Sequence, residues 1–404
     1  MNYLLESDAA LEIFAAIEDL PIVDYHSHLE ADDLLADEPF EDMAALWLGG
    51  DHYKWRLMRA GGVPEYLVTG DGEPYAKFEA FCTVLEKAVG NPVYEWSHLE
   101  LQRYFGIDLD INADNAPEIW ERANALLPEL TPLKILTASK VEVAVTTDDP
   151  TSDLTAHEQL QAKGLRVLPG FRPDSYLADA DIASRLEIEE RMAYFDARGC
   201  KTIDFGLDNF HFDTPQARLV VEMLGMAREL GWSAQIHFGA ARRQNLPGTR
   251  ALGSNVGFDS IGTQADIANH IRLLIQATHS FGMLPNLTLY PLNPADWPLI
   301  ASLVGDFQGE ARLQLGAAWW FNDHYEGIRQ QLDVYATQGL LGNFTGMLTD
   351  SRSLLSYSRH EYFRRILAQH LADWHRVGRV RDLEALKKTA MGVAYSNAKG
   401  YFGF

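Results

Sequence analysis

Eight short apolar segments recur along the chain, mostly separated by long amphipathic stretches, and this alternation limits the folds that the sequence can adopt. Each segment has the length and the β-branched or apolar composition of a strand that is buried in a parallel sheet. The predicted strands are residues 21–25, 141–146, 166–170, 202–207, 233–238, 283–290, 312–318 and 344–349. The predicted helices between the later strands are residues 182–197, 215–230, 264–281, 296–305 and 325–338. This pattern is typical of a parallel α/β fold, and the count of eight strands favours a distorted, TIM-type (β/α)8 barrel over an open sheet.

One long segment interrupts the alternation after the first predicted strand. Residues 29–140 are dense in aromatic residues, and we expect them to form a mostly helical insertion subdomain over the mouth of the barrel. Residues 1–28 are predicted to hold an N-terminal helix and the first strand. Residues 141–404 are predicted to supply the remainder of the barrel together with the C-terminal helices.

The charge balance of the chain argues against two classes of partner. The chain has 34 Lys and Arg residues against 57 Asp and Glu residues, so its formal net charge is −23. Because nucleic acids and anionic membranes would be repelled over the whole surface, we expect neither as a partner. If the substrate is an anion, the site itself must supply local arginines.

The N-terminal residues and the cysteines point to the cytoplasm. Residues 1–11 carry acidic side chains and lack the basic segment and small-residue cleavage site of a signal peptide, and no long apolar run suggests a membrane span. Cys82 and Cys200 are far apart in the sequence and cannot form a disulfide framework, which is typical of a reducing compartment. We therefore expect a cytoplasmic protein.

Polar side chains follow the ends of almost all the predicted strands. In strand order they are His26 and His28, Asp148 and Asp149, Arg172, Asp204 and Asp208, His237 with Arg242, Tyr290 and Asn293, Trp319 with Asp323, and Asp350 with Arg352. A barrel enzyme carries its catalytic residues on the loops that follow the C-terminal ends of its strands. We therefore expect these side chains to line a single polar cavity at the mouth of the barrel.

The clearest indication of a metal site is the pair His26 and His28 at the end of the first strand. Side chains alternate along a strand, so both imidazoles lie on the same face and can reach one ion. Taken alone, the pair could equally be two surface histidines. Together with His237 and Asp350 it predicts a site for one divalent metal ion, for which zinc comes first and manganese or iron are also suitable. Whether His237 binds the metal or contacts the substrate is open, so it ranks below the other three residues.

In these four residues the sequence resembles the amidohydrolase superfamily. It departs from the two-metal hydrolases of that superfamily at two strands. The fourth strand offers Asp204 where those enzymes have a bridging lysine or glutamate, and the sixth ends in Tyr290 where they have histidine. We therefore expect a single metal ion.

Longer runs carry a more specific resemblance that spans nearly the whole chain. They are DYHSHL at 24–29, WLGGDHYKWRLMRAGGV at 47–63, NPVYEWSHLEL at 91–101, TTDDP at 146–150, VLPGFRPD at 167–174, NVGFDSI at 255–261, WWFND at 319–323 and GMLTDSRSLLSYSRHEYFRRIL at 346–367. Together they resemble the uronate isomerases, a divergent branch of the amidohydrolase superfamily. These enzymes interconvert D-glucuronate with D-fructuronate and D-galacturonate with D-tagaturonate.

The resemblance implies a set of site residues. It implies metal ligation by His26, His28 and Asp350. It implies substrate contacts from His52, Tyr53, Arg172, Asp204, His237, Arg242, Trp319 and Arg352. The implied substrate is a small-molecule hexuronate, and we expect a homo-oligomer. The preferred hexuronate, the native metal and the number of subunits are not predictable from these residues.

An aldose–ketose isomerase needs a base, a group that polarises the carbonyl and an anchor for the carboxylate. Our hypothesis is that Asp350 moves the proton between C2 and C1 of the open-chain sugar through a cis-enediol. Arg352 beside it would stabilise the enediolate, and His52 or Tyr53 would handle the hydroxyl proton. Which residue returns the proton is left open.

Arg172 and Arg242 are predicted to hold substrate oxygens in bidentate fashion. The alternative is that they are structural partners of Asp148 or Asp208. Of the neighbouring Trp319 and Trp320, we expect only one to face the cavity, because side chains alternate along a strand.

Two other functions are compatible with the same residues. A hydrolase of the superfamily, acting on a lactone or amide of a sugar acid, would use a similar metal site. A sugar-acid binding protein on an inactive barrel is the non-enzymatic alternative.

Overall fold

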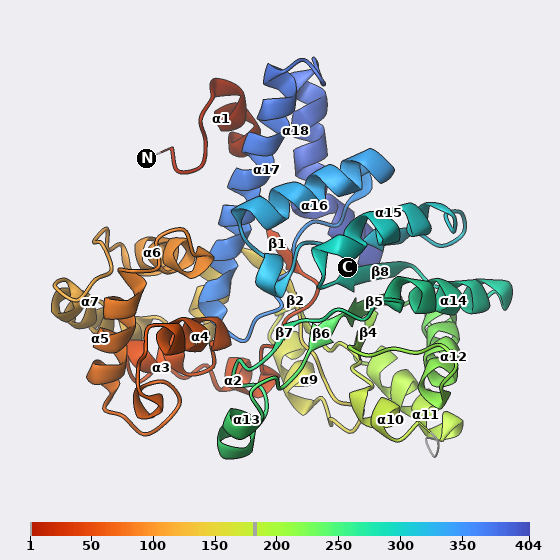
Figure 1. The fold of residues 1–404 in the computed structure, drawn as a ribbon, viewed down its shortest axis with the longest axis horizontal. Helices are drawn as coiled ribbons and strands as arrows, with labels where there is room; N and C mark the ends of the chain where they lie inside the picture. The colour runs from red at the N-terminus through yellow and green to blue at the C-terminus, as the bar shows by residue number, and fades with distance from the viewer. Residues whose placement is uncertain (1, 181–183) are drawn as a thin grey trace.

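Two parallel sheets lie at the centre of the computed structural model, which describes residues 2–180 and 184–404 (Figure 1). The first sheet has the order β1 (Ile22–Asp24), β2 (Val141–Val145) and β3 (Val167–Leu168). The second has the order β4 (Thr202–Leu207), β5 (Ser233–Phe238), β8 (Leu287–Pro291) and β9 (Leu313–Leu315). Single parallel bridges from Phe171 to Asp148 and to Ile203 connect the two sheets. The predicted α/β fold with parallel strands is confirmed.

The central strands β4 and β5 have the predicted bounds, because their sequences suit a strand that is covered on both faces. All residues of β5 are buried, and β4 is buried except at Gly206. The two strands pair over their full length, from Thr202 with Ser233 to Leu207 with Phe238. The first, second, third, sixth and seventh predicted strands are also present, each shorter than predicted.

The eighth predicted strand, residues 344–349, is not a strand in the described structure, so the prediction is wrong at this segment. Its backbone donors are taken by side chains in place of a neighbouring strand. Thr349 N donates to Asp24 Oδ1 at 2.9 Å, and Thr345 N donates to Gln314 Oε1 at 3.2 Å. Such side-chain acceptors compete with the ladder of a sheet. The described strands consequently do not form a closed sheet.

A small antiparallel pair that the sequence did not indicate follows β5. It consists of β6 (Ala240–Ala241) and β7 (Ser260–Ile261), with the helix α13 (Leu246–Leu252) between them. Strands of two residues carry too few alternating side chains to produce a periodic signal.

Helices pack around the second sheet in the predicted order. They are α11 (Arg185–Asp196), α12 (Pro215–Glu229), α14 (Ile267–Ser280), α15 (Trp297–Gly305) and α16 (Tyr325–Gln338). The first residues of the predicted helix 182–197 lie outside the described residues. At the start of α12, the Thr214 side chain accepts from Ala217 N and Pro215 occupies the first turn, where its missing N–H costs nothing.

The segment between β1 and β2 is mostly helical. Its helices are α2 (Ala31–Ala36), α3 (Met43–Leu48), α4 (His52–Ala60), α5 (Pro74–Leu85), α6 (Pro92–Phe105), α7 (Ala116–Leu126) and α8 (Pro132–Ala138). In Figure 1, α3 to α7 gather on one side of the strands and α11, α12 and α14 on the other. The fully buried rings of Trp47, Phe78 and Phe81 pack together inside this segment.

The remaining helices include α9 (Thr155–Ala162) and α10 (Asp174–Ala178), which follow β2 and β3. At the chain ends, α1 (Asp8–Ala15) packs against α17 (Ser358–Arg376), and α18 (Leu383–Met391) and α19 (Asn397–Phe402) follow. No helix in the described part of the chain combines the length and the apolar character that crossing a membrane requires.

Candidate active site

A polar cavity of about 480 Å³ opens at the C-terminal ends of the parallel strands. Its lining includes His26, His28, His52, Tyr53, Arg172, His237, Arg242, Trp319, Asp350 and Arg352. All the predicted site residues except Asp204 therefore line one cavity. Asp204 is 3% exposed and lies beneath this lining, in contact with two of its members.

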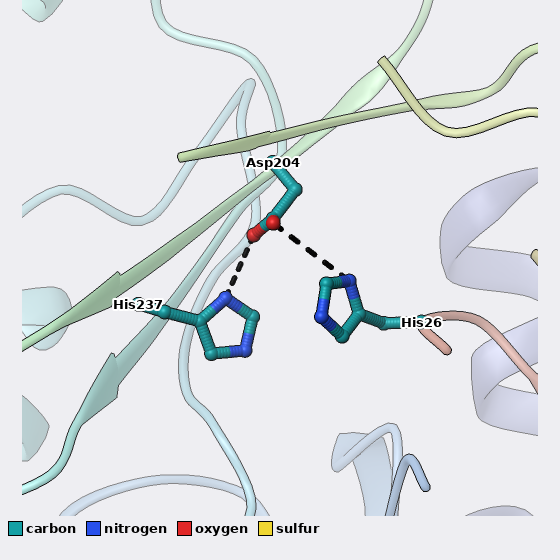
Figure 2. Close-up of side chains that lie close together, drawn as sticks. All are labelled: His26, Asp204 and His237. Carbon is teal, nitrogen blue, oxygen red and sulfur yellow. Dashed lines mark hydrogen bonds and ion pairs between the residues drawn. The ribbon is translucent and has the colours of Figure 1, made fainter. Parts of the chain in front are cut away.

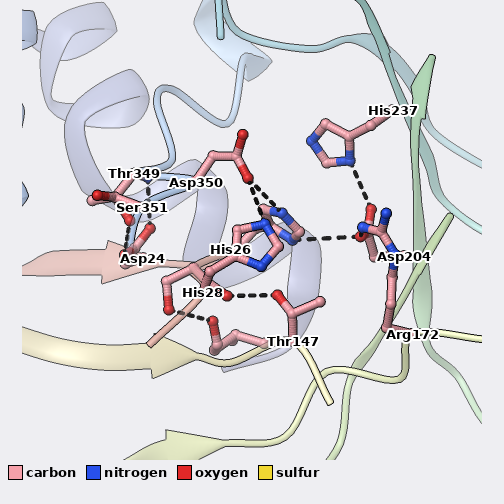
Figure 3. A network of polar contacts seen from close by, with 12 residues as sticks. Asp24, His26, His28, Thr147, Arg172, Asp204, His237, Thr349, Asp350 and Ser351 are labelled. Carbon is pink, nitrogen blue, oxygen red and sulfur yellow. Dashed lines mark hydrogen bonds and ion pairs between the residues drawn. The ribbon is translucent and has the colours of Figure 1, made fainter. Parts of the chain in front are cut away.

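Among the described residues, two groups that share His26 could hold a metal ion, and each has two imidazoles and one carboxylate. One consists of His26, Asp204 and His237, and the other of His26, His28 and Asp350 (Figure 3). His26 Nε2 and His28 Nε2 lie 3.1 Å and 3.0 Å from Asp350 Oδ1. One ligand atom of each residue lies within 4.8 Å of the others. Imidazole nitrogen with carboxylate oxygen is a donor set that zinc, manganese and iron accept. The residues therefore fit a single divalent cation.

Backbone contacts hold these three residues at the junction of β1 with the segment that follows residue 344. Asp350 N donates to the His26 carbonyl at 3.1 Å, and His28 N donates to the Ser351 carbonyl at 3.0 Å. Asp350 has a left-handed backbone conformation, with φ of 45°. Non-glycine residues rarely adopt this conformation, and it persists where surrounding contacts hold it, often at functional sites.

A second group of contacts centres on Asp204 and shares His26 with the first (Figure 2). His237 Nδ1 lies 2.7 Å from Asp204 Oδ1, and His26 Nδ1 lies 3.9 Å from Asp204 Oδ2. Arg172 Nη1 donates to Asp204 Oδ2 on its other side. A carboxylate that accepts from the far nitrogen of an imidazole orients the ring and selects its tautomer. Asp204 therefore orients His237 and contributes to the orientation of His26.

The protonation of this second group follows from its surroundings. Burial would raise the pKa of Asp204, but the charges of Arg172, His26 and His237 outweigh it and hold that pKa well below its usual range. Burial lowers the pKa of His237, and the nearby Asp204 only partly opposes this. A neutral His237 that donates from Nδ1 presents Nε2 as an acceptor. Nε2 is buried and has no hydrogen-bond partner among the described residues, so it is available to a ligand in the cavity.

The first turn of α4 supplies a further part of the cavity wall, with His52 and Tyr53. The Asp51 side chain caps this helix by accepting from Tyr53 N at 2.9 Å and Lys54 N at 3.2 Å, which places His52 and Tyr53 in the first turn. Burial lowers the pKa of His52 to about 4, so its ring is neutral at pH 7. Burial also raises the pKa of the Tyr53 hydroxyl well above its usual value, so this group stays protonated.

Sequence analysis gave structural pairing with Asp148 or Asp208 as the alternative role for Arg172 and Arg242, and in the described structure such a pair is present for only one of these arginines. Arg242 pairs with Asp208, with Nε 2.9 Å from Oδ2, as that alternative anticipated. The Arg172 guanidinium pairs with Asp174 and Asp204. The contact of Arg172 with Asp148 is between backbone groups only, from Arg172 N to the Asp148 carbonyl at 2.9 Å. Both guanidinium groups also line the cavity, so structural pairing and ligand contact are compatible here.

The expectation that only one of the two tryptophans faces the cavity is wrong, because both line it. β9 ends at Leu315, before these residues, and Trp320 has a left-handed conformation with φ of 52°. The alternation of a strand therefore does not apply to them. Two cavity residues that sequence analysis missed are Asp51 and Asp259. Both lie within the runs that carry the family resemblance, which was the available signal.

Comparison with known proteins identifies the family. The family model described as glucuronate isomerase matches residues 1–187 and 215–402. The chain belongs to this family. A uronate isomerase of Lactococcus lactis subsp. cremoris (strain MG1363) is 40% identical over 458 residues, covering 100% of this chain and 97% of the relative. A uronate isomerase of Caldanaerobacter subterraneus subsp. tengcongensis is 38% identical and is covered over 98% of its length.

Solved structures agree with the family assignment. The crystal structure of uronate isomerase from Thermotoga maritima is 32% identical, with a TM-score of 0.91 over 99% of this chain and 98% of that one. The glucuronate isomerase of Caulobacter crescentus, at 22% identity and a TM-score of 0.90, shares the fold. Asp204 lies in residues 188–214, between the two parts matched by the family model, so its place in the site rests on its contacts with His237 and Arg172.

Proposed function

We propose that this protein interconverts the aldose and ketose forms of hexuronates, D-glucuronate with D-fructuronate and D-galacturonate with D-tagaturonate. One observation carries the proposal. The group of His26, His28 and Asp350 opens on the same cavity as Arg242 and Arg352, so groups suited to moving a proton and groups suited to binding a carboxylate meet around one ligand volume. Membership of the family supports the same reaction and does not favour the alternative of a hydrolase.

His26, His28 and Asp350 would hold one divalent ion, with zinc as the first candidate and manganese or iron as the others. When bound, such an ion would act as a Lewis acid toward substrate oxygens and stabilise the negative charge that develops on them. Asp204 would help to orient His26, and His237 would contact the substrate.

Asp350 would carry the proton between carbons. Its Oδ1 contacts both imidazoles, whereas Oδ2 has no hydrogen bond among residues 2–180 and 184–404. The carboxylate would take the proton from C2 of the open-chain aldehyde, leaving the electron pair in a cis-enediolate, and deliver the proton to C1. Arg352, two residues away at the same wall, would stabilise the negative charge of the enediolate.

A second proton must move from the hydroxyl on C2 to the oxygen on C1. His52 and Tyr53 are placed for this task in the first turn of α4. A neutral imidazole can donate and accept in turn, and the Tyr53 hydroxyl remains a donor. Arg172 and Arg242 would bind substrate oxygens, with Trp319 as an apolar wall.

We propose that the two sheets belong to one distorted (β/α)8 barrel that the segment after residue 344 completes without strand geometry. The hydrogen bonds of Asp350 N to His26 O and of His28 N to Ser351 O support this closure on the β1 side. On the β9 side, Gln314 Nε2 donates to Asn343 O at 3.0 Å. We further propose that residues 29–140 form a subdomain over the mouth, since His52 and Tyr53 reach the cavity from it.

The function is tested by incubating the purified protein separately with D-glucuronate and D-galacturonate and following ketose formation. We expect turnover of at least one of them, loss of turnover after dialysis against a chelator, and recovery when zinc, manganese or iron is added back. Hydrolysis of a panel of sugar-acid lactones without any uronate turnover would instead support the hydrolase. The expected homo-oligomer stays a prediction, which light scattering coupled to size-exclusion chromatography checks.

A further inference from the structure

Arg56 lies one turn after His52 on α4, and its guanidinium reaches across to the segment that precedes β7. Residues four apart lie on the same face of a helix. Arg56 Nη1 donates to the carbonyl of Gly257 at 2.7 Å and to the carbonyl of Asp259 at 2.8 Å. Arg56 is not among the described residues that line the cavity. It therefore joins the helix of His52 to a wall segment without entering the ligand volume itself.

The segment is packed closely enough against α4 that glycine is required at the contact. Gly257 has φ of +89°, a conformation that favours glycine. A Cβ atom at this position would lie 3.0 Å from Arg56 Cγ and 3.2 Å from the carbonyl oxygen of His52. The first turn of α4 and this segment are thus in direct contact, and the hydrogen bonds of Arg56 stabilise that contact.

From Asp259 the connection continues to the arginines of the cavity. The pairing of Ala241 with Ser260 in the β6–β7 pair places Arg242 and Asp259 opposite each other. Asp259 Oδ1 accepts from Arg243 N at 2.7 Å, and Oδ2 accepts from Arg242 Nη1 at 3.4 Å. Asp259 is 7% exposed, so its carboxylate depends on these donors for compensation of its charge.

A stack of side chains makes a second connection between the same two arginines. The Arg242 guanidinium lies over the Trp320 ring at 4.8 Å from its centroid. Trp320 stacks on Phe321 with the ring centroids 4.9 Å apart and the planes inclined by 13°. The Arg56 guanidinium covers Phe321 at 4.8 Å. Each guanidinium–ring contact is attractive, so the order Arg242, Trp320, Phe321, Arg56 is held from both ends.

We propose that Arg56 is a positioning residue that sets the orientation of Arg242 for the substrate carboxylate, through Asp259 on one side and through Phe321 and Trp320 on the other. The proposal rests on the proposed function, in which Arg242 contacts the hexuronate. Arg242 also pairs with Asp208 through Nε, and with these two further connections its guanidinium enters the complex already oriented, so less orientational freedom is lost on binding. The effect of Arg56 is therefore on substrate binding, with little effect on the proton transfers.

The test compares Arg56→Ala and Arg56→Lys with wild type in KM, kcat and the affinity for L-gulonate. L-Gulonate is D-glucuronate with its aldehyde reduced to an alcohol, so it keeps the carboxylate and the hydroxyl chain but has no carbonyl to isomerise, and calorimetry measures its binding without turnover. For Arg56→Ala we expect KM and the dissociation constant of L-gulonate to rise about tenfold while kcat changes less than about threefold. Arg56→Lys keeps the charge but loses the planar stacking, and we expect an intermediate result.

Arg59 provides the matched control. It lies on the same helix and donates from Nη1 to the Val256 carbonyl of the same segment at 2.5 Å. Its other hydrogen bonds go to Glu65 and its guanidinium covers the Phe258 ring, and among the described residues it has no hydrogen bond with Asp259 and no cation–π contact with Phe321. Arg59→Ala should leave KM within about twofold of wild type. Equal increases in KM for Arg56→Ala and Arg59→Ala would show that general loosening of the segment is the cause and would overturn the proposal.

A double-mutant cycle separates coupling from independent effects. If Arg56 acts through Arg242, Arg56→Ala should raise the L-gulonate dissociation constant less than about twofold in an Arg242→Ala background. The same tenfold rise in both backgrounds would contradict the proposal, as would unchanged affinity in Arg56→Ala itself. Absence of hexuronate turnover by the wild-type protein would overturn the proposed function instead, and the L-gulonate affinities would still test the coupling of the two arginines.

Discussion

Two groups that contain histidine and aspartate lie at neighbouring strand ends of this protein, and they differ in their access to the cavity and in the pKa of their carboxylates. The first, called here the open group, consists of His26, His28, Asp204, His237 and Asp350. The second, called here the sealed group, consists of Thr146, Asp148 and His157 at the end of β2 and on α9. All members of the open group except Asp204 line the cavity, whereas the members of the sealed group are not among the described residues that line it.

The side chains of the sealed group contact one another and the backbone of Leu168 and Gly170. The Thr146 hydroxyl donates to Asp148 Oδ2 at 2.6 Å and lies 2.8 Å from His157 Nε2. Burial raises the pKa of Asp148 to about 6 and lowers the pKa of His157 to about 4. Burial thus shifts both groups toward their uncharged forms.

In the open group burial acts in the same direction, but neighbouring charges reverse the outcome for the carboxylates. Arg172 beside Asp204 keeps the pKa of that carboxyl well below its usual range despite burial. The comparison teaches that residue type and position at a strand end do not define a site. A site also needs a positively charged side chain that keeps the acid ionised, and its residues must border a cavity that a ligand can enter.

The largest difference between the groups should appear when one carboxylate of each is neutralised. For Asp350→Asn we expect turnover to fall at least about a thousandfold, because the proton carrier is lost. For Asp148→Asn we expect turnover within about threefold of wild type. Steady-state rates with either hexuronate, with metal content measured in parallel, give the comparison. Full turnover by Asp350→Asn that retains its metal would remove Asp350 from the proton-transfer role.

The open group should also depend on its arginine for stability. In Arg172→Gln the buried Asp204 loses its main compensating charge, and we expect the free energy of unfolding to fall by about 3 kcal/mol. Arg166→Gln is the matched control, because Arg166 makes a surface pair with Glu142 and its loss should cost less than about 1 kcal/mol. Chemical denaturation of both variants measures the difference. Equal effects would mean that Asp204 does not need its partner.

Replacing one histidine from each group separates activity from stability. His237→Gln removes the acceptor that faces the cavity, and we expect turnover to fall about a hundredfold with a smaller loss of stability. His157→Gln should leave turnover within about threefold, because this ring lies behind the cavity wall. If His157→Gln impaired turnover as much as His237→Gln, access to the cavity would not be the property that distinguishes the groups.

The smallest expected effect is a pH dependence of stability that arises in the sealed group. The pKa of His157 is about 4 in the folded state against about 6.5 in an unfolded chain, so the unfolded state binds more protons between these values. The contribution of the neutral ring is therefore complete above pH 6.5 and is lost as the pH falls toward 4. Between pH 7 and pH 5, wild type should lose about 2 kcal/mol more than His157→Gln in urea denaturation. Parallel losses in both proteins would show that His157 does not cause the dependence.

The regular part of the fold was predictable from the sequence because it follows local patterns. The bounds of β4, β5 and α16 agree with their predictions, since apolar runs and helical periodicity are properties of consecutive residues. Residues 344–349 have an equally apolar sequence and were predicted as a strand for the same reason. Their backbone donors go to Asp24 and Gln314, which are remote in the chain, and no local pattern reports such acceptors.

The candidate site was predictable where a motif concentrates its residues and unpredictable where contacts cross between segments. His26 and His28 form a His-x-His motif, and Asp350 lies at the end of a predicted strand. The stack of Arg242, Trp320, Phe321 and Arg56 joins three separate segments of the chain. Its geometry depends on the left-handed conformation of Trp320, which tertiary contacts impose on a residue that has no preference for it.

The sequence by itself determined the alternation of strands and helices, the polar character of one end of the sheets and the family to which the chain belongs. Only the tertiary structure decided that the eighth segment is irregular, that Asp204 lies beneath the cavity lining and pairs with Arg172, and that both tryptophans border the cavity. The physical reason is the range of the interactions. Periodicity and capping act between near neighbours, whereas burial, charge compensation and stacking depend on which distant residues share the same space.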